Sequence, residues 1–503
     1  MASERVGAGE DRIGELVHGL AAGLETETPY GPVLVPSAGF YTGIFAWDSA
    51  WHYFVLKEID ASRAVAEVQT LLATADSDGR VPHETRFDPE ESHAPGRRLQ
   101  LALLGNTYAP DGRSHFIDPP VHAWAAADAV TSGAAAGRAA ADLLIAAARS
   151  LDALARTRTL GDLPYPYSHL PVILHPLESG TDGSPQFDEI YGGTLGTVRA
   201  MVRLGRRLGR LGWDPAAARA AGIPVIFDIT VVAFYLVGLV AVRAAAVSLP
   251  REDAATVREA LPAIDGIDEL VASTLEAFRQ EEHGLFTTRW IGTSRWIGTR
   301  RWIGSAGDAA AIRTCRTPTL SGVLPLLVGL VGDGDAASNR VPPGGRGAAE
   351  WWPAGVPEPG DLVARHLAPG GTFRKDHLPR YTMPPVAAGR RGGRGVTEGR
   401  RGESRATEGR RTGSSGERRE PVARLLWRGP CSWMNMNYCV WGHLPQYGRE
   451  EDAAELARRA AATVARLGPY EYFHADGSEG GGAHPFSWNG LVLPMVRAAD
   501  MAV

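Results

Sequence analysis

Helical periodicity recurs along almost the whole chain, and it constrains the fold more than any other sequence feature. In residues 10–24, apolar side chains recur at helical spacing. The same pattern returns in residues 45–60, 62–76, 121–158, 197–212, 253–282, 320–331 and 452–468, whereas strand-like alternation is nearly absent. Roughly ten or more helices joined by loops favour an all-α toroid of helical hairpins over a four-helix bundle.

Two segments sharpen the helix prediction. Residues 229–242 form an apolar run bounded by Asp228 and Arg243, and the run is shorter than the roughly 20 residues that a membrane span needs. We therefore expect a helix that is apolar all round and buried between other helices. The Ala-rich residues 121–158 predict two helices that divide near Ser132 and Gly133.

Composition places the chain among ordinary globular proteins. It has 503 residues, of which 44% are hydrophobic and 22% charged, and its net charge is -5. This balance indicates neither a nucleic acid nor a membrane as partner. Three cysteines without a CxxC pair argue against a disulfide framework or a cysteine zinc site. The charged N-terminus lacks the apolar core of a secretory signal, so we expect a cytoplasmic protein.

Two stretches interrupt the expected single domain, which spans residues 1–503. Residues 287–317 repeat the unit RWIG, which places Trp290, Trp296 and Trp302 at equal spacing. We predict a locally duplicated loop, with a tryptophan-lined binding platform as the alternative. Residues 387–421 are rich in Arg, Gly and Glu and hold no aromatic residue, which predicts a disordered insertion rather than an RNA-binding tract.

Carboxylates gather in the loops between the helices, together with aromatic and amide side chains. The acidic loop, residues 175–189, holds Glu178, Asp182, Asp188 and Glu189 among glycines and prolines, and by itself it favours a solvated connector. Residues 41–49, 427–438 and 470–488 add indoles, carboxylates and amides. Aromatic rings can cover the faces of a sugar while polar groups bind its hydroxyls. Hydrolysis of a glycosidic bond needs two carboxyl groups.

Six motifs occur in one order. They are Trp47-Asp48-Ser49, VPHE at 81–84, DPPVHAW at 118–124, the acidic loop, WRGP at 427–430 with Asn435 and Asn437, and the closing EYF and FSW. The series resembles the family 63 glycoside hydrolases, particularly the bacterial branch with mannosylglycerate and glucosylglycerate hydrolases. The resemblance implies an (α/α)6 barrel and inversion at the anomeric carbon. We expect no cofactor, because the chemistry is proton transfer at two carboxylates, and the scarcity of metal-ligand spacings argues against a zinc-dependent chemistry.

The resemblance also implies the two catalytic residues. The family's general acid falls on Asp182 and its general base on Glu471. An inverting enzyme needs room for a water, so these carboxyl groups should lie roughly 6.5–9.5 Å apart. Asp182 must stay protonated, and we expect a dry environment and carboxylates such as Glu178 to raise its pKa.

Further family positions imply contacts with a small sugar. The expected substrate-binding residues are Tyr41, Trp47, Asp48, Asp118, Trp427, Arg428, Trp433 and Trp488. Asp48 has a helix N-terminal cap as its alternative role. Arg428 could instead hold a loop carboxylate, and Trp488 could form the wall of the site. His83 and Glu84 either line the site or close a helical hairpin.

Departures from the family pattern bear on the substrate. Asp118 stands where relatives usually have glutamine, and a carboxylate there would repel an anionic glycerate. Leu426 and Gly183 also replace the usual residue types. We expect an inverting glycosidase for a small α-glucoside or α-mannoside. A non-catalytic sugar-binding relative, or another chemistry such as a lyase on the same toroid, is the alternative. The oligomeric state stays open.

Overall fold

The computed structural model describes residues 2–87, 107–292, 311–331, 352, 357–382 and 427–500. Its centre is a closed ring, in which each element packs against the next and the last returns to the first. In ring order the elements are α2 (Ala46–Leu56), α5 (Val121–Thr131), α10 (Ile229–Ala246), η6 (Leu320–Leu327), α15 (Met434–His443) and η10 (Ser487–Leu491). The ring encloses much of one continuous apolar core.

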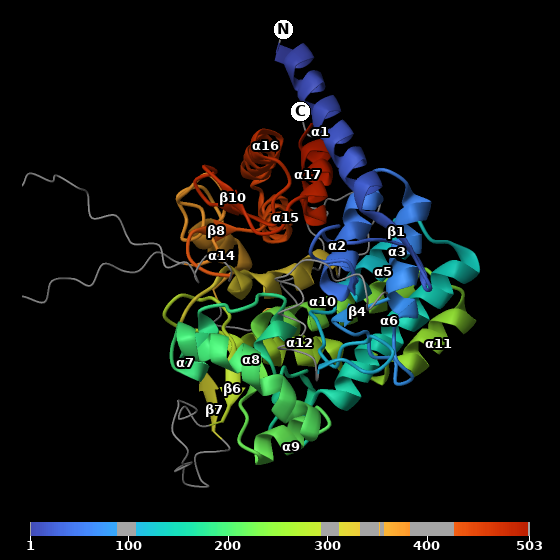
Figure 1. Ribbon diagram of the computed structural model, residues 1–503, viewed down its shortest axis with the longest axis vertical. Coiled ribbons are helices and arrows are strands. Elements are labelled where there is room, and N and C mark those ends of the chain that lie inside the picture. Colours follow the sequence, from blue (N-terminus) through green and yellow to red (C-terminus); the bar gives the residue numbers. More distant parts are fainter. Residues whose placement is uncertain are drawn as a thin grey trace, which may run out of the picture.

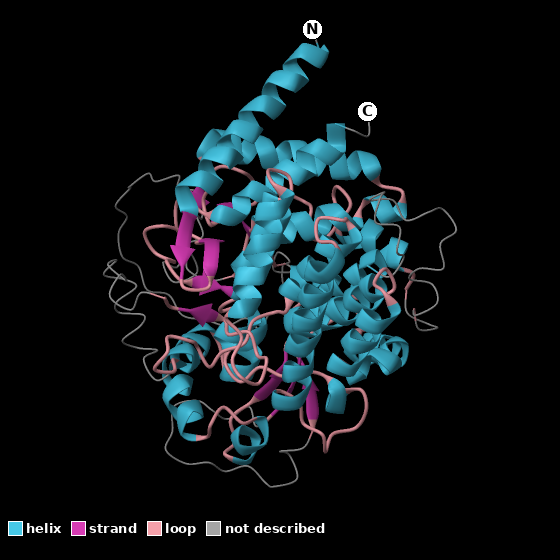
Figure 2. Cartoon of the chain, turned by 90° about the vertical axis from the view of Figure 1, so that its right-hand side faces the viewer, coloured by secondary structure: helices cyan, strands magenta, loops and turns pink. Residues whose placement is uncertain are grey.

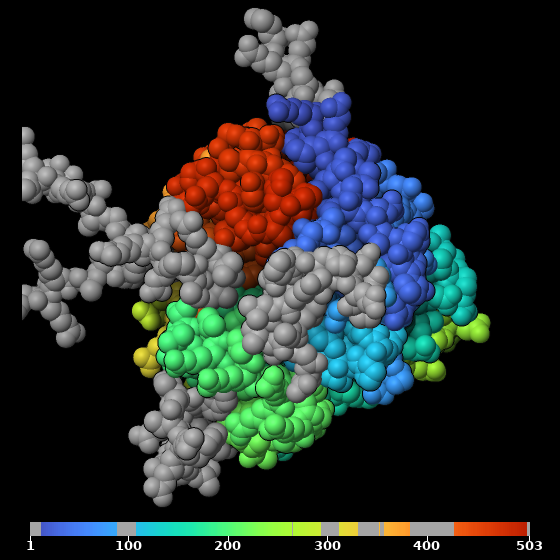
Figure 3. Space-filling view, viewed as in Figure 1, coloured from blue at the N-terminus to red at the C-terminus, as the bar shows by residue number. Residues whose placement is uncertain are grey.

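An outer layer of helices covers this ring (Figure 1). α3 (Ala61–Ala73) packs on α2, α6 (Gly137–Thr157) on α5, α12 (Ile267–Phe278) on α10 and α16 (Glu450–Leu467) on α15. The first and last helices pack together, because α1 (Ala2–Leu24) contacts both η10 and α17 (Val492–Asp500). The blue and red parts of the surface adjoin in Figure 3. The predicted toroid of helical hairpins is therefore confirmed.

The remaining described helices are short or lie at the periphery. They are α7 (Gln186–Tyr191), α8 (Thr194–Arg210), α9 (Pro215–Ala220), α11 (Arg251–Ala260), α13 (Val328–Val331) and α14 (Pro359–His366), with single 3-10 turns at Tyr167–His169, Pro176–Ser179 (η3), Pro262–Gly266 and Pro445–Tyr447. α7 and η3 belong to the acidic loop, so most of that loop is helical rather than extended.

α10 is the buried helix that the apolar run predicts. Its length and composition would suit a membrane span, but 89% of it is buried inside the protein. Asp228 caps it, because its carboxylate accepts the backbone N–H groups of Thr230 and Val231 at 2.9 and 3.3 Å. The predicted division near Ser132 is also confirmed, since α5 ends at Thr131 and α6 begins at Gly137.

Short strands are the main feature that the helical pattern did not indicate (Figure 2). They are β1 (Glu25–Thr28), β2 (Gly31–Leu34), β3 (Ile44–Phe45), β4 (Glu84–Thr85), β5 (Val225–Phe227), β6 (Arg289–Ile291), β7 (Ile312–Thr314), β8 (Cys431–Ser432), β9 (Tyr472–His474) and β10 (Gly480–Gly481). Their pairs are antiparallel; β3 pairs with β4, and β9 lies between β8 and β10. Strands of two to four residues are too short to show alternation.

The prediction of a loop over residues 287–317 is wrong at both ends of that range. β6 pairs with β5 on one side and with β7 on the other. Trp290, in the first repeat, is only 4% exposed, so it cannot present a binding face to solvent. Trp296, Trp302 and the whole of 387–421 lie outside the described residues.

Candidate active site

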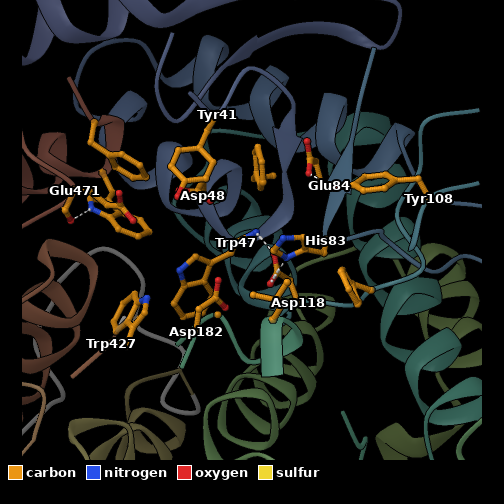
Figure 4. A pocket seen from close by; sticks show the side chains of 16 residues that line it. Tyr41, Trp47, Asp48, His83, Glu84, Tyr108, Asp118, Asp182, Trp427 and Glu471 are labelled. Carbon is orange, nitrogen blue, oxygen red and sulfur yellow. Dashed lines mark hydrogen bonds and ion pairs between the residues drawn. The ribbon is translucent and has the colours of Figure 1, made fainter. Parts of the chain in front are cut away.

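A cavity of about 690 Å³, including its open mouth, lies where the helical hairpins are joined by loops. Its walls are Tyr41, Phe45, Trp47, Asp48, His83, Glu84, Tyr108, Phe116, Asp118, Leu177, Gly180, Asp182, Trp427, Glu471, Phe486 and Trp488. In Figure 4, Glu471 lies at one end of the cavity, Glu84 and Tyr108 lie at the other, and Asp48 and Asp182 lie between them. Carboxyl groups and aromatic rings thus face a common space, a mixture that suits a sugar.

The start of α2 supplies two buried polar groups to this cavity. Asp48 is 7% exposed and Trp47 3% exposed, and the Oδ1 of Asp48 and the Nε1–H of Trp47 have no hydrogen-bond partner among the described residues. Burial raises the pKa of Asp48 well above its usual range, and Asp118 adds to the shift. The N-cap of α2 is Phe45, without a side-chain cap bond, so a capping role for Asp48 is wrong. Both polar groups remain available to sugar hydroxyls.

Three of the four carboxylates in the acidic loop are used to hold the structure. Glu178 is fully buried, pairs with Arg158 at 2.8 Å and accepts the backbone N–H of Leu174 at 2.7 Å. Asp188 accepts both terminal nitrogens of Arg428 at 2.6 and 2.7 Å. Glu189 accepts the backbone N–H groups of residues 316 and 317. These hydrogen bonds and ion pairs hold the acidic loop in place, and Asp182 is the carboxylate of the loop that faces the cavity.

Removing the charge of Glu178 should destabilise the protein. Glu178→Gln leaves the guanidinium of Arg158, which is 2% exposed, without its counter-charge. Breaking a buried ion pair from one side costs about 3–5 kcal/mol, and we expect a loss of that size in the free energy of unfolding from urea titration. Asp142→Asn, which breaks an exposed pair with Arg138, is the matched control and should cost less than about 1 kcal/mol. Equal losses in the two variants would contradict this account.

Asp182 has the electrostatic environment of a proton donor. Burial, opposed by the charge of His83 and aided by the charges of Asp118 and Glu471, raises the pKa of its carboxyl group to about 7. Glu178, the neighbour that we expected to contribute, is neutralised by Arg158 instead. Gly180 lets the loop approach α2, because a Cβ there would lie 3.2 Å from the ring of Trp47 and its φ is +68°.

Glu471 faces the same cavity from the C-terminal loops. Burial raises the pKa of its carboxyl group to about 7, but the backbone N–H of Ala483, which donates to Oε2 at 2.9 Å, opposes the shift. Gly482 allows this turn, because its φ is +81° and a Cβ there would lie 2.5 Å from Oε2. Glu471 therefore has a donor that favours its ionised form.

His83 and Asp118 form a pair beside these groups. Nδ1 of His83 lies 2.9 Å from Oδ1 of Asp118, and Oδ2 of Asp118 accepts the backbone N–H of Trp47 at 3.1 Å. Burial alone would lower the pKa of His83, but Asp118 and other carboxylates raise it to about 9. Burial raises the pKa of Asp118, against the effect of His83. The positive charge of a protonated His83 therefore lies beside the Asp118 carboxyl group and offsets its charge when that group is ionised.

The structure separates the predicted substrate-binding residues into two groups. Tyr41, Trp47, Asp48, Asp118, Trp427 and Trp488 line the cavity, whereas Trp433 and Arg428 lie behind it. Trp433 stacks on Trp427, with ring centroids 4.1 Å apart and an interplanar angle of 8°. Arg428 is held by Asp188, which matches the loop-carboxylate alternative.

Several lining residues were not predicted from the sequence. Tyr108 donates its hydroxyl to Glu84, and Phe116 and Phe486 complete the aromatic wall. Tyr108 stands outside the six motifs, so the motif order gave no signal for it. His83 and Glu84 both line the cavity, as the first of their two predicted roles requires. Glu84 also pairs with Phe45 in the β3–β4 pair, between the chain segments that flank α2 and α3, which agrees with the second role of closing a helical hairpin. Among the described residues, no three His, Cys, Asp or Glu side chains could hold a metal ion together.

The ring, its outer helices and the aromatic cavity with its carboxyl groups define a toroidal glycosidase-like fold. A model of the mannosylglycerate hydrolase MGH1-like glycoside hydrolase domain matches residues 41–341 and 412–489. The chain belongs to this family.

Known relatives agree with the family. Glucosylglycerate hydrolase of Mycolicibacterium hassiacum is 29% identical over 182 residues, which is 33% of this chain and 37% of that protein. Mannosylglycerate hydrolase MGH1 of Selaginella moellendorffii is 30% identical over 166 residues, which is 32% of each chain. The matched region thus spans about a third of the length of these relatives.

Solved structures confirm the fold over almost the full length. The family 63 mannosylglycerate hydrolase of Thermus thermophilus, in complex with Tris, superposes with a TM-score of 0.63 at 20% identity. The match covers 97% of this chain and 99% of that one. A second structure of that enzyme, in complex with glucose, gives a TM-score of 0.61 at 19% identity, again covering 97% and 99% of the two chains. The predicted (α/α)6 barrel is therefore confirmed.

Proposed function

We propose that this protein is an inverting glycoside hydrolase that cleaves a small α-glucoside or α-mannoside of the glucosylglycerate or mannosylglycerate type. One observation carries the proposal: Asp182 and Glu471, from opposite parts of the chain, line one cavity with aromatic walls. The family and the named activities of its relatives support this substrate class. We further propose that the whole toroid, residues 1–503, acts as one cytoplasmic catalytic domain.

The surroundings of the two carboxyl groups favour different protonation states. Glu471 accepts a backbone N–H, whereas the Asp182 carboxyl group has no hydrogen-bond donor among the described residues. The charge of Glu471 also raises the pKa of Asp182. Of the two groups, Asp182 is therefore the one better suited to keep its proton near pH 7, and Glu471 the one better suited to lose it.

This asymmetry gives each group its role. Asp182 donates its proton to the glycosidic oxygen as the bond to the anomeric carbon breaks. Glu471 removes a proton from a water that attacks the opposite face of the sugar, and the product has the inverted configuration. We expect their carboxyl oxygens to lie roughly 6.5–9.5 Å apart, which leaves room for that water. No cofactor is required for these proton transfers.

Sugar binding follows from the walls of the cavity. We assign hydroxyl binding to Asp48 and to the Nε1–H of Trp47, because both are buried without a partner among the described residues. Tyr41, Trp427 and Trp488 supply aromatic surface for the sugar ring. Trp433 and Arg428 support that surface from behind, through the stack on Trp427 and the pair with Asp188.

The pair of His83 and Asp118 makes a glycerate group acceptable. A carboxylate at position 118 would repel an anionic aglycone if it stood alone. His83 lies 2.9 Å from that carboxylate, and the positive charge of its protonated ring offsets the charge of the carboxylate, so the repulsion is removed. The departure from the family's glutamine is thereby compensated within the cavity.

Removing His83 should reveal this compensation. His83→Gln leaves Asp118 without its partner, and we expect the KM for the glycosylglycerate to rise about tenfold relative to the KM for the neutral glycosylglycerol. Steady-state kinetics on the two substrates at pH 8 measure the ratio. The double variant His83→Gln/Asp118→Asn removes both charges and should return the ratio to that of the wild type. Equal changes in both KM values for His83→Gln would contradict the compensation.

A substrate panel tests the proposed function. Glucosylglycerate, mannosylglycerate, trehalose and short α-glucans are incubated with the wild type and with Asp182→Asn. We expect the wild type to release glucose or mannose from at least one glycerate substrate, and the variant to be far slower. Equal rates for the two proteins would overturn the enzymatic assignment, and release from trehalose alone would overturn the glycerate class.

A further inference from the structure

A buried hydrogen-bonded chain links α2, α3 and η10 behind the cavity. Nδ1 of His52 lies 3.0 Å from Oε1 of Glu67, and Nε2 of His52 lies 2.5 Å from Oγ of Ser487. His52 and Glu67 are 0% exposed and Ser487 is 3% exposed. Glu67 also accepts the backbone N–H of Leu34 at 3.0 Å and a guanidinium N–H of Arg63 at 3.1 Å. Glu67, the acidic end of this hydrogen-bonded chain, is therefore held in place by its partners.

The chain has the connectivity of a serine–histidine–acid triad, but its burial excludes nucleophilic attack on a ligand. Ser487 does not line the cavity, and its hydroxyl is engaged by His52. When the Nδ1–H of His52 donates to Glu67, Nε2 is left to accept the hydroxyl proton of Ser487. This buried chain is therefore suited to holding neighbouring residues in position rather than to reacting with a ligand.

The two residues that follow Ser487 hold the backbone around the proposed base. The Nε1–H of Trp488 donates to the carbonyl oxygen of Glu471 at 3.0 Å. Nδ2 of Asn489 donates to the carbonyl oxygen of Tyr470 at 2.6 Å. η10 therefore fixes the chain on both sides of the Glu471 side chain, and Ser487 fixes the start of η10.

His52, the central residue of this hydrogen-bonded chain, lies on the helix that carries the sugar-binding groups Trp47 and Asp48. His52 follows Asp48 by four residues in α2, so both side chains lie on one face of that helix. The bond from His52 to Ser487 thus joins the helix of Asp48 directly to the segment that holds Glu471. A shift of this contact would move the base relative to the bound sugar.

We propose that His52 and Ser487, oriented by Glu67, are positioning residues that set the general base Glu471 against the sugar held by α2. The inference rests on the proposed function and extends it to residues outside the cavity. Misplacement of a reacting group by about an ångström can cost roughly 100-fold in rate. Because Trp47 and Asp48 stay in place on α2, the loss should appear mainly in kcat rather than in KM.

Ser487→Ala tests the proposal with the smallest possible change. We expect kcat to fall at least about tenfold with KM changed less than about threefold. Ser150→Ala is the matched control, because Ser150 is a buried serine whose Oγ lies 2.9 Å from Nε2 of His122, outside the cavity. It should leave kcat unchanged, although it loses two buried hydrogen bonds, to His122 and to the carbonyl oxygen of Ala147, and Ser487→Ala loses one. Equal kcat values in the two variants would overturn the positioning role.

A double-mutant cycle separates this inference from the proposed function. If Ser487 acts through Glu471, Ser487→Ala should cause no further loss in the Glu471→Gln background. A full additional loss in that background would also overturn the inference. If Glu471→Gln alone has the wild-type rate, the proposed function itself fails. If Glu471→Gln is slow but Ser487→Ala behaves as Ser150→Ala, only the positioning role fails.

Discussion

Asp182→Asn is expected to lower kcat on the glycerate substrate by about 10²–10⁴-fold, the usual contribution of a positioned acid. The amide has nearly the shape of the acid but cannot donate the proton that the leaving oxygen needs. In the wild type, kcat should fall as the pH rises above about 7, where Asp182 loses its proton. This alkaline decline should be absent from the residual activity of Asp182→Asn.

A substrate with a better leaving group shows whether Asp182→Asn has lost the donation of a proton. An α-glycosyl fluoride of the same sugar needs little acid assistance, so Asp182→Asn should retain much more of the wild-type rate on the fluoride than on the glycerate substrate. Asp162→Asn is the matched control, because Asp162 pairs with Arg219 at the surface and should not affect either rate. Equal fractional losses on the two substrates would show that Asp182 has another role.

Glu471→Gln is expected to lose about 10²–10⁴-fold on both the glycerate substrate and the fluoride. The attacking water must still be deprotonated in each case, whatever the leaving group. The amide keeps the shape of the side chain and places no charge in the cavity. Steady-state rates on the two substrates therefore distinguish a base from an acid.

Added azide provides a second test of the Glu471→Gln variant. Azide is already an anion and needs no base, so it should restore turnover of Glu471→Gln and give the β-glycosyl azide. The same azide should not accelerate Asp182→Asn on the glycerate substrate. Full fluoride activity of Glu471→Gln without azide would contradict the assignment of Glu471 as base.

The toroid and the two opposed carboxyl groups could be predicted because their signals are local or ordered along the chain. The unbroken apolar run located α10, and Ser132 and Gly133 marked the division between α5 and α6. The order of the six motifs led to Asp182 and Glu471, which line one cavity in the structure. Neither inference needed to know which distant side chains meet.

The roles of the remaining carboxylates could not be predicted, because they depend on distant contacts. Asp188 is held by Arg428, 240 residues further on, and Glu178 by Arg158 and by the backbone N–H of Ile117. The acidic loop, taken by itself, shows no difference between these groups and Asp182. Only packing reveals that each of them is neutralised or bonded.

Substrate preference could not be predicted from the sequence either, because it depends on the contact between His83 and Asp118. The sequence showed an acid in place of an amide, and the isolated change argued against a glycerate group. The compensation that we propose for His83 depends on its 2.9 Å contact with Asp118 across the loops. The short strands β3 and β4, which bring residues 83–85 beside α2, leave no periodic pattern in the sequence.

The configuration of the first sugar released tests the central claim most directly. Proton NMR is recorded within the first minutes of hydrolysis of the α-glycosylglycerate by the wild type, before mutarotation equilibrates the anomers. An inverting reaction between Asp182 and Glu471 predicts the β-anomer as the first product. The α-anomer as first product would contradict the roles assigned to both carboxyl groups.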